Sequence, residues 1–101
     1  MTAAAPPPAR VQVVAQEFSF SLSRRTIKTG DAIVELVNQG QDAHDLRLKR
    51  NGGTRVYTWP VVQAGAYADR EYRLLPGVYV LWCSLADHRA RGMSAILVVR
   101  R

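Results

Sequence analysis

One cysteine, Cys83, stands among the 101 residues, so an internal disulfide is excluded. The thiol is then a small buried group, a free thiol or a metal ligand. Long apolar runs are lacking as well, because no stretch approaches the ~20 residues that a membrane-spanning helix needs. We therefore expect no direct insertion into a membrane, and the cysteine count alone indicates no compartment.

Acidic residues are few: 8 Asp and Glu oppose 14 Lys and Arg, which gives a net charge of +6. The basic residues are scattered in runs no longer than a pair, such as Arg24-Arg25 and Arg100-Arg101. Nucleic-acid binders instead concentrate basic residues in a stripe, often interleaved with exposed aromatics, so no nucleic-acid partner is expected. Most of this charge is predicted to be solvated surface, and the sharper interpretation is docking to an acidic partner protein.

Apolar residues make up 48% of a chain of single-domain length, which is enough for one compact core. Residues 1–9 (MTAAAPPPA) are rich in alanine and proline and predict an extended leader, followed by one domain over residues 10–101. The leader lacks the basic and apolar regions of a secretory signal. We interpret it as the remnant of a spacer that follows an export signal or anchor in the natural protein.

Strand-like alternation of apolar and polar residues begins after residue 10, with frequent turn signals such as Asn51-Gly52-Gly53 and Pro76-Gly77. The predicted strands cover residues 11–13, 18–22, 32–37, 45–50, 67–74, 78–83 and 93–99. Residues 56–66 predict irregular structure or a short helix, because Pro60 and Gly65 interrupt them. The pattern indicates an all-β, two-sheet antiparallel Greek-key sandwich of seven or eight strands.

Both histidines, the cysteine and the only methionine after Met1 form a set of candidate metal ligands: His44, Cys83, His88 and Met93. Alone, each is more often a core or surface residue. Together they supply a soft thiolate, two imidazoles and a thioether, which is the donor set of a blue-copper site. The sequence therefore predicts one mononuclear type 1 copper ion.

The spacing of three of these residues suits a clamped metal loop. Cys83 ends one predicted strand, Met93 begins the next, and His88 lies five residues from each. In the first of these strands Tyr79, Leu81 and Cys83 share a face, so the thiol is predicted to point into the core. His44 comes from a different hairpin and would tie the loop to the rest of the sandwich.

The sequence resembles the cupredoxins, the group of plastocyanin, azurin and rusticyanin. Residues 77–84 (GVYVLWCS) are similar to the family's strand into the copper loop, and Cys83-x4-His88-x4-Met93 is similar to the longer loops of the rusticyanin type. Residues 38–45 (NQGQDAHD) resemble the segment around the family's first ligand. The resemblance covers roughly residues 10–101.

The resemblance implies a function and roles for the residues. His44, Cys83 and His88 would be the equatorial ligands, Met93 the axial ligand, and the exposed ring edge of His88 the route for electrons. It implies an electron carrier rather than an enzyme, with a redox partner protein. It also implies a monomer in an extracytoplasmic location, periplasmic or at the cell surface, with a membrane tether in the full-length form.

Three positions depart from the family pattern. Ala86-Asp87 precedes the loop histidine, where relatives often carry Pro-Gly, which predicts a less rigid loop. Asp45 replaces the usual asparagine after the first histidine; we expect it to accept a hydrogen bond from Ser84 and, as a carboxylate, to lower the reduction potential. Ala43 stands where plastocyanins tend to have proline.

Three other functions stay open at this point. The chain could store or deliver copper, although it lacks the Met-rich or His-rich stretches common in such proteins. It could be a redox module of a larger oxidase, or a metal-free immunoglobulin-like interaction domain in which Cys83 is simply buried. Zinc also suits two histidines and a cysteine.

Overall fold

The computed structural model describes residues 6–101, which form nine strands and no helix. The strands are β1 (Ala9–Gln16), β2 (Ser19–Leu22), β3 (Thr26–Lys28), β4 (Gly30–Asn38), β5 (His44–Arg50), β6 (Val56–Val62), β7 (Tyr67–Leu74), β8 (Gly77–Trp82) and β9 (Ser94–Arg100). Since residues 6–101 contain no helix, none of them forms a helical membrane span. The leader predicted over residues 1–9 falls mostly on residues 1–5, which lie outside the described residues, and β1 begins at Ala9.

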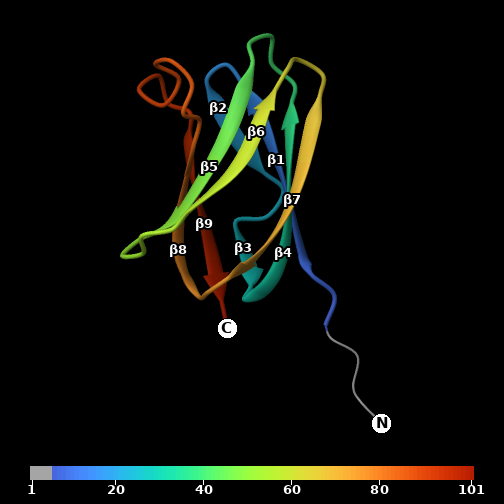
Figure 1. The fold of residues 1–101 in the computed structure, drawn as a ribbon, viewed down its shortest axis with the longest axis vertical. Helices are drawn as coiled ribbons and strands as arrows, with labels where there is room; N and C mark the ends of the chain where they lie inside the picture. The colour runs from blue at the N-terminus through green and yellow to red at the C-terminus, as the bar shows by residue number, and fades with distance from the viewer. Residues whose placement is uncertain (1–5) are drawn as a thin grey trace.

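The strands form two packed sheets (Figure 1), one in the order β2-β1-β4-β7 and the other in the order β3-β9-β8-β5-β6. The predicted all-β sandwich is confirmed. The prediction of purely antiparallel pairing is wrong, because β1 pairs in parallel with β4, and β3 pairs in parallel with β9. Both exceptions join strands that no short turn connects, so no local hairpin imposes an antiparallel direction.

The segment predicted to be irregular or helical is strand β6. Pro60 lies inside it, but β6 is an edge strand, where a missing backbone N–H is tolerated. The ladder to β5 also shifts register here, since His44 pairs with Val62 while Leu46 pairs with Trp59. Pro60 does not end the strand, because it lies in a bulge at the edge of the sheet. The three-residue strand β3 also escaped prediction.

Alternating side chains from both sheets form the core between them. On β5, Leu46 and Leu48 are buried while Lys49 is exposed, as the sequence pattern predicts. On β8 and just beyond it, Tyr79 and Cys83 are buried, so the thiol points inward. A polar bond also joins the sheets, because the Trp59 indole N–H donates to the carbonyl of Val34 across the core at 2.9 Å.

The β1–β2 turn, the β4–β5 loop and the β8–β9 loop lie at one end of the sandwich (Figure 1), together with the β6–β7 connection. The parallel pairing of β1 with β4 brings the first two connections to the same end, because both strands run toward it. All three candidate ligands with nitrogen or thiol donors come from this end.

Candidate metal centre

Three of the predicted ligands converge in the structure. One donor atom from each of His44, Cys83 and His88 lies within 4.8 Å of the others, and all three residues are buried. The Cys83 Sγ and the His88 Nδ1 are 3.5 Å apart, and the two imidazole rings are 5.0 Å apart between centroids. Residues separated by 44 positions in the sequence therefore form one compact donor set.

The His44 ring has one nitrogen bound and one free. Its Nε2 lies 3.0 Å from a carboxylate oxygen of Glu17, while its Nδ1 has no hydrogen-bond partner. Among residues 6–101, this Nδ1 is the one buried side-chain nitrogen or oxygen without a partner. Buried polar atoms are nearly always satisfied, so such an exception needs an explanation, and a bound metal ion would supply one.

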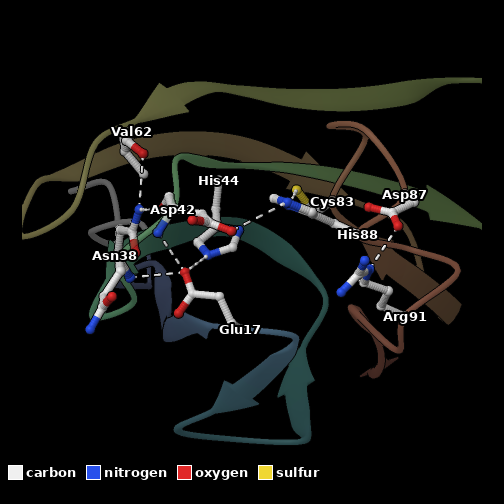
Figure 2. Close-up of polar contacts among 10 residues, drawn as sticks. Glu17, Asn38, Asp42, His44, Val62, Cys83, Asp87, His88 and Arg91 are labelled. Atoms are coloured by element: carbon white, nitrogen blue, oxygen red, sulfur yellow. Dashed lines mark hydrogen bonds and ion pairs between the residues drawn. The ribbon is translucent and has the colours of Figure 1, made fainter.

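Local structure explains how His44 is held. The buried Asn38 side chain donates to the carbonyls of Asp42 (2.8 Å) and Val62 (3.0 Å), and its oxygen accepts the Gly40 N–H at 2.8 Å (Figure 2). These bonds fix the β4–β5 loop against the end of β6. The loop therefore delivers His44 to the first position of β5 in one orientation.

Burial and the backbone also define the environment of the loop ligands. Burial raises the pKa of the Cys83 thiol, and a coordinating metal ion would deprotonate it. The Cys83 N–H donates to the Met93 carbonyl, and the Met93 N–H donates to the His88 carbonyl at 3.1 Å. Met93 is fully buried, and these backbone bonds join it to Cys83 and His88, so it remains the candidate axial ligand.

Asp45 binds Ser84, the residue that follows the thiol ligand Cys83. One of its oxygens accepts the Ser84 N–H at 2.7 Å, and the other accepts the Ser84 hydroxyl in a short hydrogen bond. The hydrogen bond predicted between these residues is thus present in two forms. Asp45 is buried, and the Arg47 side chain approaches it at 3.4 Å, so the carboxylate joins β5 to the start of the metal loop.

Backbone hydrogen bonds and one ion pair connect the residues of the metal loop, which lacks Pro-Gly before the loop histidine. The His88 N–H donates to the Leu85 carbonyl and the Arg91 N–H donates to the carbonyls of Asp87 and His88, all at 3.0–3.1 Å. The Arg91 guanidinium also binds the Asp87 carboxylate at 2.7 Å, which lowers the pKa of that carboxyl. Within this framework Ala86 adopts a φ of 44°, in the left-handed region that non-glycine residues rarely occupy.

The side chains around the exposed edge of His88 form a rim of mixed charge. Phe18 lies against its ring at 5.0 Å between centroids, and the Arg91 guanidinium covers Phe18 at 4.9 Å. The side chain of His88 is 10% exposed, and its Nε2 lies 3.9 Å from an Asp42 carboxylate oxygen. Because Asp42 adds an acid and Asp87 pairs with Arg91, positive charge does not dominate this rim.

Glu17 and Phe18 are the site residues that sequence reasoning missed. Both lie in the turn between β1 and β2, more than 25 residues from the ligands they contact. Neither belongs to a motif, and the sequence shows them only as an acidic and an aromatic residue between two alternating segments. Their role is visible only once the parallel β1–β4 pairing places this turn beside the ligands.

The comparisons with known proteins begin with two negative findings: no protein-family model and no curated protein matches the sequence. Solved structures do match. Auracyanin A, described as a "blue" copper protein from Chloroflexus aurantiacus, is 13% identical at a TM-score of 0.74, over 93% of this chain and all of that one. Reduced rusticyanin is 21% identical at a TM-score of 0.66, over 94% of this chain and 82% of that one. The chain has the cupredoxin fold.

Cupredoxin domains also occur inside larger proteins. A copper-containing nitrite reductase from Thermus scotoductus SA-01 matches all of this chain at 23% identity and a TM-score of 0.60. The match covers 24% of the reductase chain. The match to auracyanin A, by contrast, covers all of that chain.

Proposed function

We propose that this chain is a type 1 copper electron-transfer protein. The observation that carries the proposal is the convergence of one donor atom from each of His44, Cys83 and His88 within 4.8 Å, together with the buried, unpartnered Nδ1 of His44. Met93 would supply the weak axial contact. Bound there, copper would supply a one-electron couple between Cu(I) and Cu(II).

The spacing of the donors fits a shared metal ion. With metal–sulfur and metal–nitrogen bonds of about 2.3 and 2.1 Å and angles near 110–120°, a sulfur and a nitrogen ligand lie roughly 3.6–3.8 Å apart. The 3.5 Å between Cys83 Sγ and His88 Nδ1 is close to this separation. The mixture of one thiolate with two imidazoles favours copper or zinc over hard ions such as magnesium or calcium.

Burial favours an electron carrier over a copper store or chaperone. His44, Cys83 and Met93 are fully buried, so an incoming copper acceptor could not reach them without opening the loop. An electron needs only a short covalent path to the surface, and the partly exposed ring of His88 offers one. The unpartnered His44 Nδ1 argues against a metal-free interaction domain, which would have no use for it.

We propose no enzymatic activity for this chain. Its match to auracyanin A spans that whole protein, whereas its match to the nitrite reductase spans a quarter of the reductase. A role as the redox module of a larger oxidase is the second candidate, and the partial match to a larger copper-containing enzyme, the nitrite reductase, favours such a modular role. The extracytoplasmic location follows from the family resemblance alone and stays a prediction.

The partner is proposed to be an acidic redox protein. A shallow surface groove on the β5–β6–β8 face is lined by three cations, Lys49, Arg50 and Arg89, and by no acidic residue. The Arg89 guanidinium lies over the Trp82 ring, 4.6 Å from its centroid. Trp82 immediately precedes Cys83 in the sequence. Arg89, which belongs to the metal loop, lines this groove, so an acidic partner bound there would contact the loop through Arg89.

Adding Cu(II) to the purified protein tests the central proposal. We expect an intense blue or green colour that disappears on reduction, because a copper–thiolate bond forms at Cys83. Cys83→Ser should stay colourless, while Ser94→Ala, an exposed change just beyond the loop, should colour normally. A coloured Cys83→Ser protein would defeat the ligand assignment, and irreversible voltammetry of the native protein would favour a store over a carrier.

A further inference from the structure

The β1–β2 turn places a carboxylate against the outer nitrogen of one ligand. One oxygen of Glu17 lies 2.8 Å from the Gln41 N–H nitrogen, 2.6 Å from the Asp42 N–H nitrogen and 3.0 Å from the His44 Nε2 (Figure 2). Two backbone donors and one ring nitrogen thus converge on a single acceptor atom. The Glu17 side chain is 26% exposed, so it lies at the edge of the site between loop and solvent.

This arrangement decides which His44 nitrogen carries the proton. A carboxylate can only accept, so the Nε2 facing it must be the donor, and in a neutral imidazole the other nitrogen is then a free lone pair. That other nitrogen is the buried, unpartnered Nδ1. The bond to Glu17 therefore leaves the metal-facing nitrogen deprotonated and fixes the plane of the ring.

Gly40 makes the room that the carboxylate occupies. A Cβ atom added at Gly40 would lie 2.5 and 2.6 Å from the two Glu17 oxygens, closer than real Cβ atoms approach other atoms. Any side chain at this position would push the carboxylate away from the His44 ring. The Glu17 carboxylate can therefore reach His44 only because Gly40 has no side chain, although 23 positions separate the two residues in the sequence.

We infer that Glu17 is a positioning residue of the metal centre: through Nε2 it holds His44 in the tautomer and orientation that present Nδ1 to the metal. The inference rests on the proposed function for its purpose, because the tautomer matters only if a metal binds. Glu17 does not touch the metal position itself. Its two bonds to the β4–β5 loop could serve folding alone, so the test must separate positioning from loop stabilisation.

The first test is nitrogen NMR of the His44 ring in the native, metal-free protein at about pH 8, where an imidazole is normally neutral. We expect Nε2 to carry the proton and Nδ1 to be bare. A ring protonated at Nδ1 would overturn the inference outright. The measurement needs no copper, so a bare Nδ1 in a protein that never turns blue would defeat the copper proposal while leaving the assignment of the tautomer to Glu17 intact.

The second test uses variants and Cu(II) affinity measured by competition with a chelator. Glu17→Ala should lower the affinity 10–100-fold, the usual cost of losing such a partner of a ligand. Glu17→Gln should lower it less than tenfold and keep the native tautomer. Its carbonyl oxygen, rather than its amide nitrogen, must face His44, because the Gln41 and Asp42 N–H groups need an acceptor there.

Matched controls complete the design. Glu71→Ala makes the same change on β7, the edge strand opposite to β2, and should leave both readouts unchanged. Gly40→Ala should reproduce the loss seen in Glu17→Ala without removing any charge, while Gly53→Ala in the β5–β6 turn should not. Native tautomer and native affinity in both Glu17→Ala and Gly40→Ala would reduce Glu17 to a loop-stabilising residue and sink the inference.

Discussion

Asp45 accepts both hydrogen-bond donors of Ser84, the residue that follows the thiol ligand Cys83. The bond to the backbone N–H fixes the first residue of the metal loop, and the bond to the hydroxyl fixes its side chain. A carboxylate here brings negative charge to the thiolate side of the site, where an asparagine would bring none. The relationship therefore bears on both the rigidity of the loop and the reduction potential.

Asp45→Asn is predicted to raise the reduction potential by about 50 mV, which corresponds to roughly 1 kcal/mol. The amide oxygen can still accept the Ser84 N–H, so the main change is the loss of a negative charge that favours Cu(II). Cyclic voltammetry of the copper-loaded protein measures the shift. Asp31→Asn, at the start of β4 on the other sheet, is the matched control and should leave the potential unchanged; an unmoved potential in Asp45→Asn would contradict the electrostatic role.

Ala86→Gly is predicted to raise the free energy of unfolding by about 0.5–1 kcal/mol, because Ala86 has a φ of 44° that glycine adopts without strain. Ala90→Gly, an exposed change in the same loop without a positive φ, should instead lower it by a similar amount. Urea unfolding of the metal-free protein measures both. Equal losses of stability in Ala86→Gly and Ala90→Gly would contradict backbone strain at Ala86.

Tyr79→Phe is predicted to cost about 1 kcal/mol of stability, because the buried hydroxyl donates to the Leu75 carbonyl at 2.7 Å. Burial also raises the pKa of Tyr79 above its ordinary value of 10.0. The folded state thus favours the neutral phenol, so this contribution is fully present below about pH 10 and is lost as the pH rises through the higher folded-state value.

Thermal unfolding between pH 8 and 11 checks this prediction. The native protein should lose stability above pH 10 more steeply than Tyr79→Phe does. Tyr67→Phe is the control, since Tyr67 is 66% exposed. Parallel alkaline decline in the native protein and in Tyr79→Phe would show that the Tyr79 phenol is not responsible.

Charge reversal in the basic groove is predicted to slow electron exchange with an anion. The Lys49→Glu and Arg89→Glu double variant in its Cu(I) form should reduce ferricyanide at least tenfold more slowly than the native protein at low ionic strength, and the difference should shrink as salt rises. Stopped-flow absorbance measures the rate. The Lys28→Glu and Arg70→Glu double variant changes the net charge equally on β3 and β7; equal slowing there, or rates independent of salt, would remove the groove from the proposal.

The sequence predicts this site better than it predicts the strand pairing around it. Alternation along residues 78–83 places the Cys83 thiol correctly in the core, and the resemblance correctly anticipates the Asp45–Ser84 bond. Both depend on local periodicity or on a known motif. Strand β6 was missed because Pro60 carries a strong local signal that an edge-strand bulge overrides.

Contacts between distant segments explain the remaining failures. Glu17 meets His44 only because β1 and β4 run in parallel, and Phe18 meets His88 only because both sheets close at one end. No periodicity in a single sequence encodes which strands pair across such separations. Asp42 likewise reaches His88 from a loop more than 40 residues away.

The parallel pairing of β3 with β9 determines when the sheet that carries the metal loop can form during folding. Residues 26–28 can pair only once residues 98–100 of β9 have been synthesised. The metal loop lies immediately before β9 in the sequence. Contacts of such long range make folding slow and concerted. A partly synthesised chain therefore lacks the closed sheet that holds the donor set, and metal loading is expected to follow completion of the whole domain.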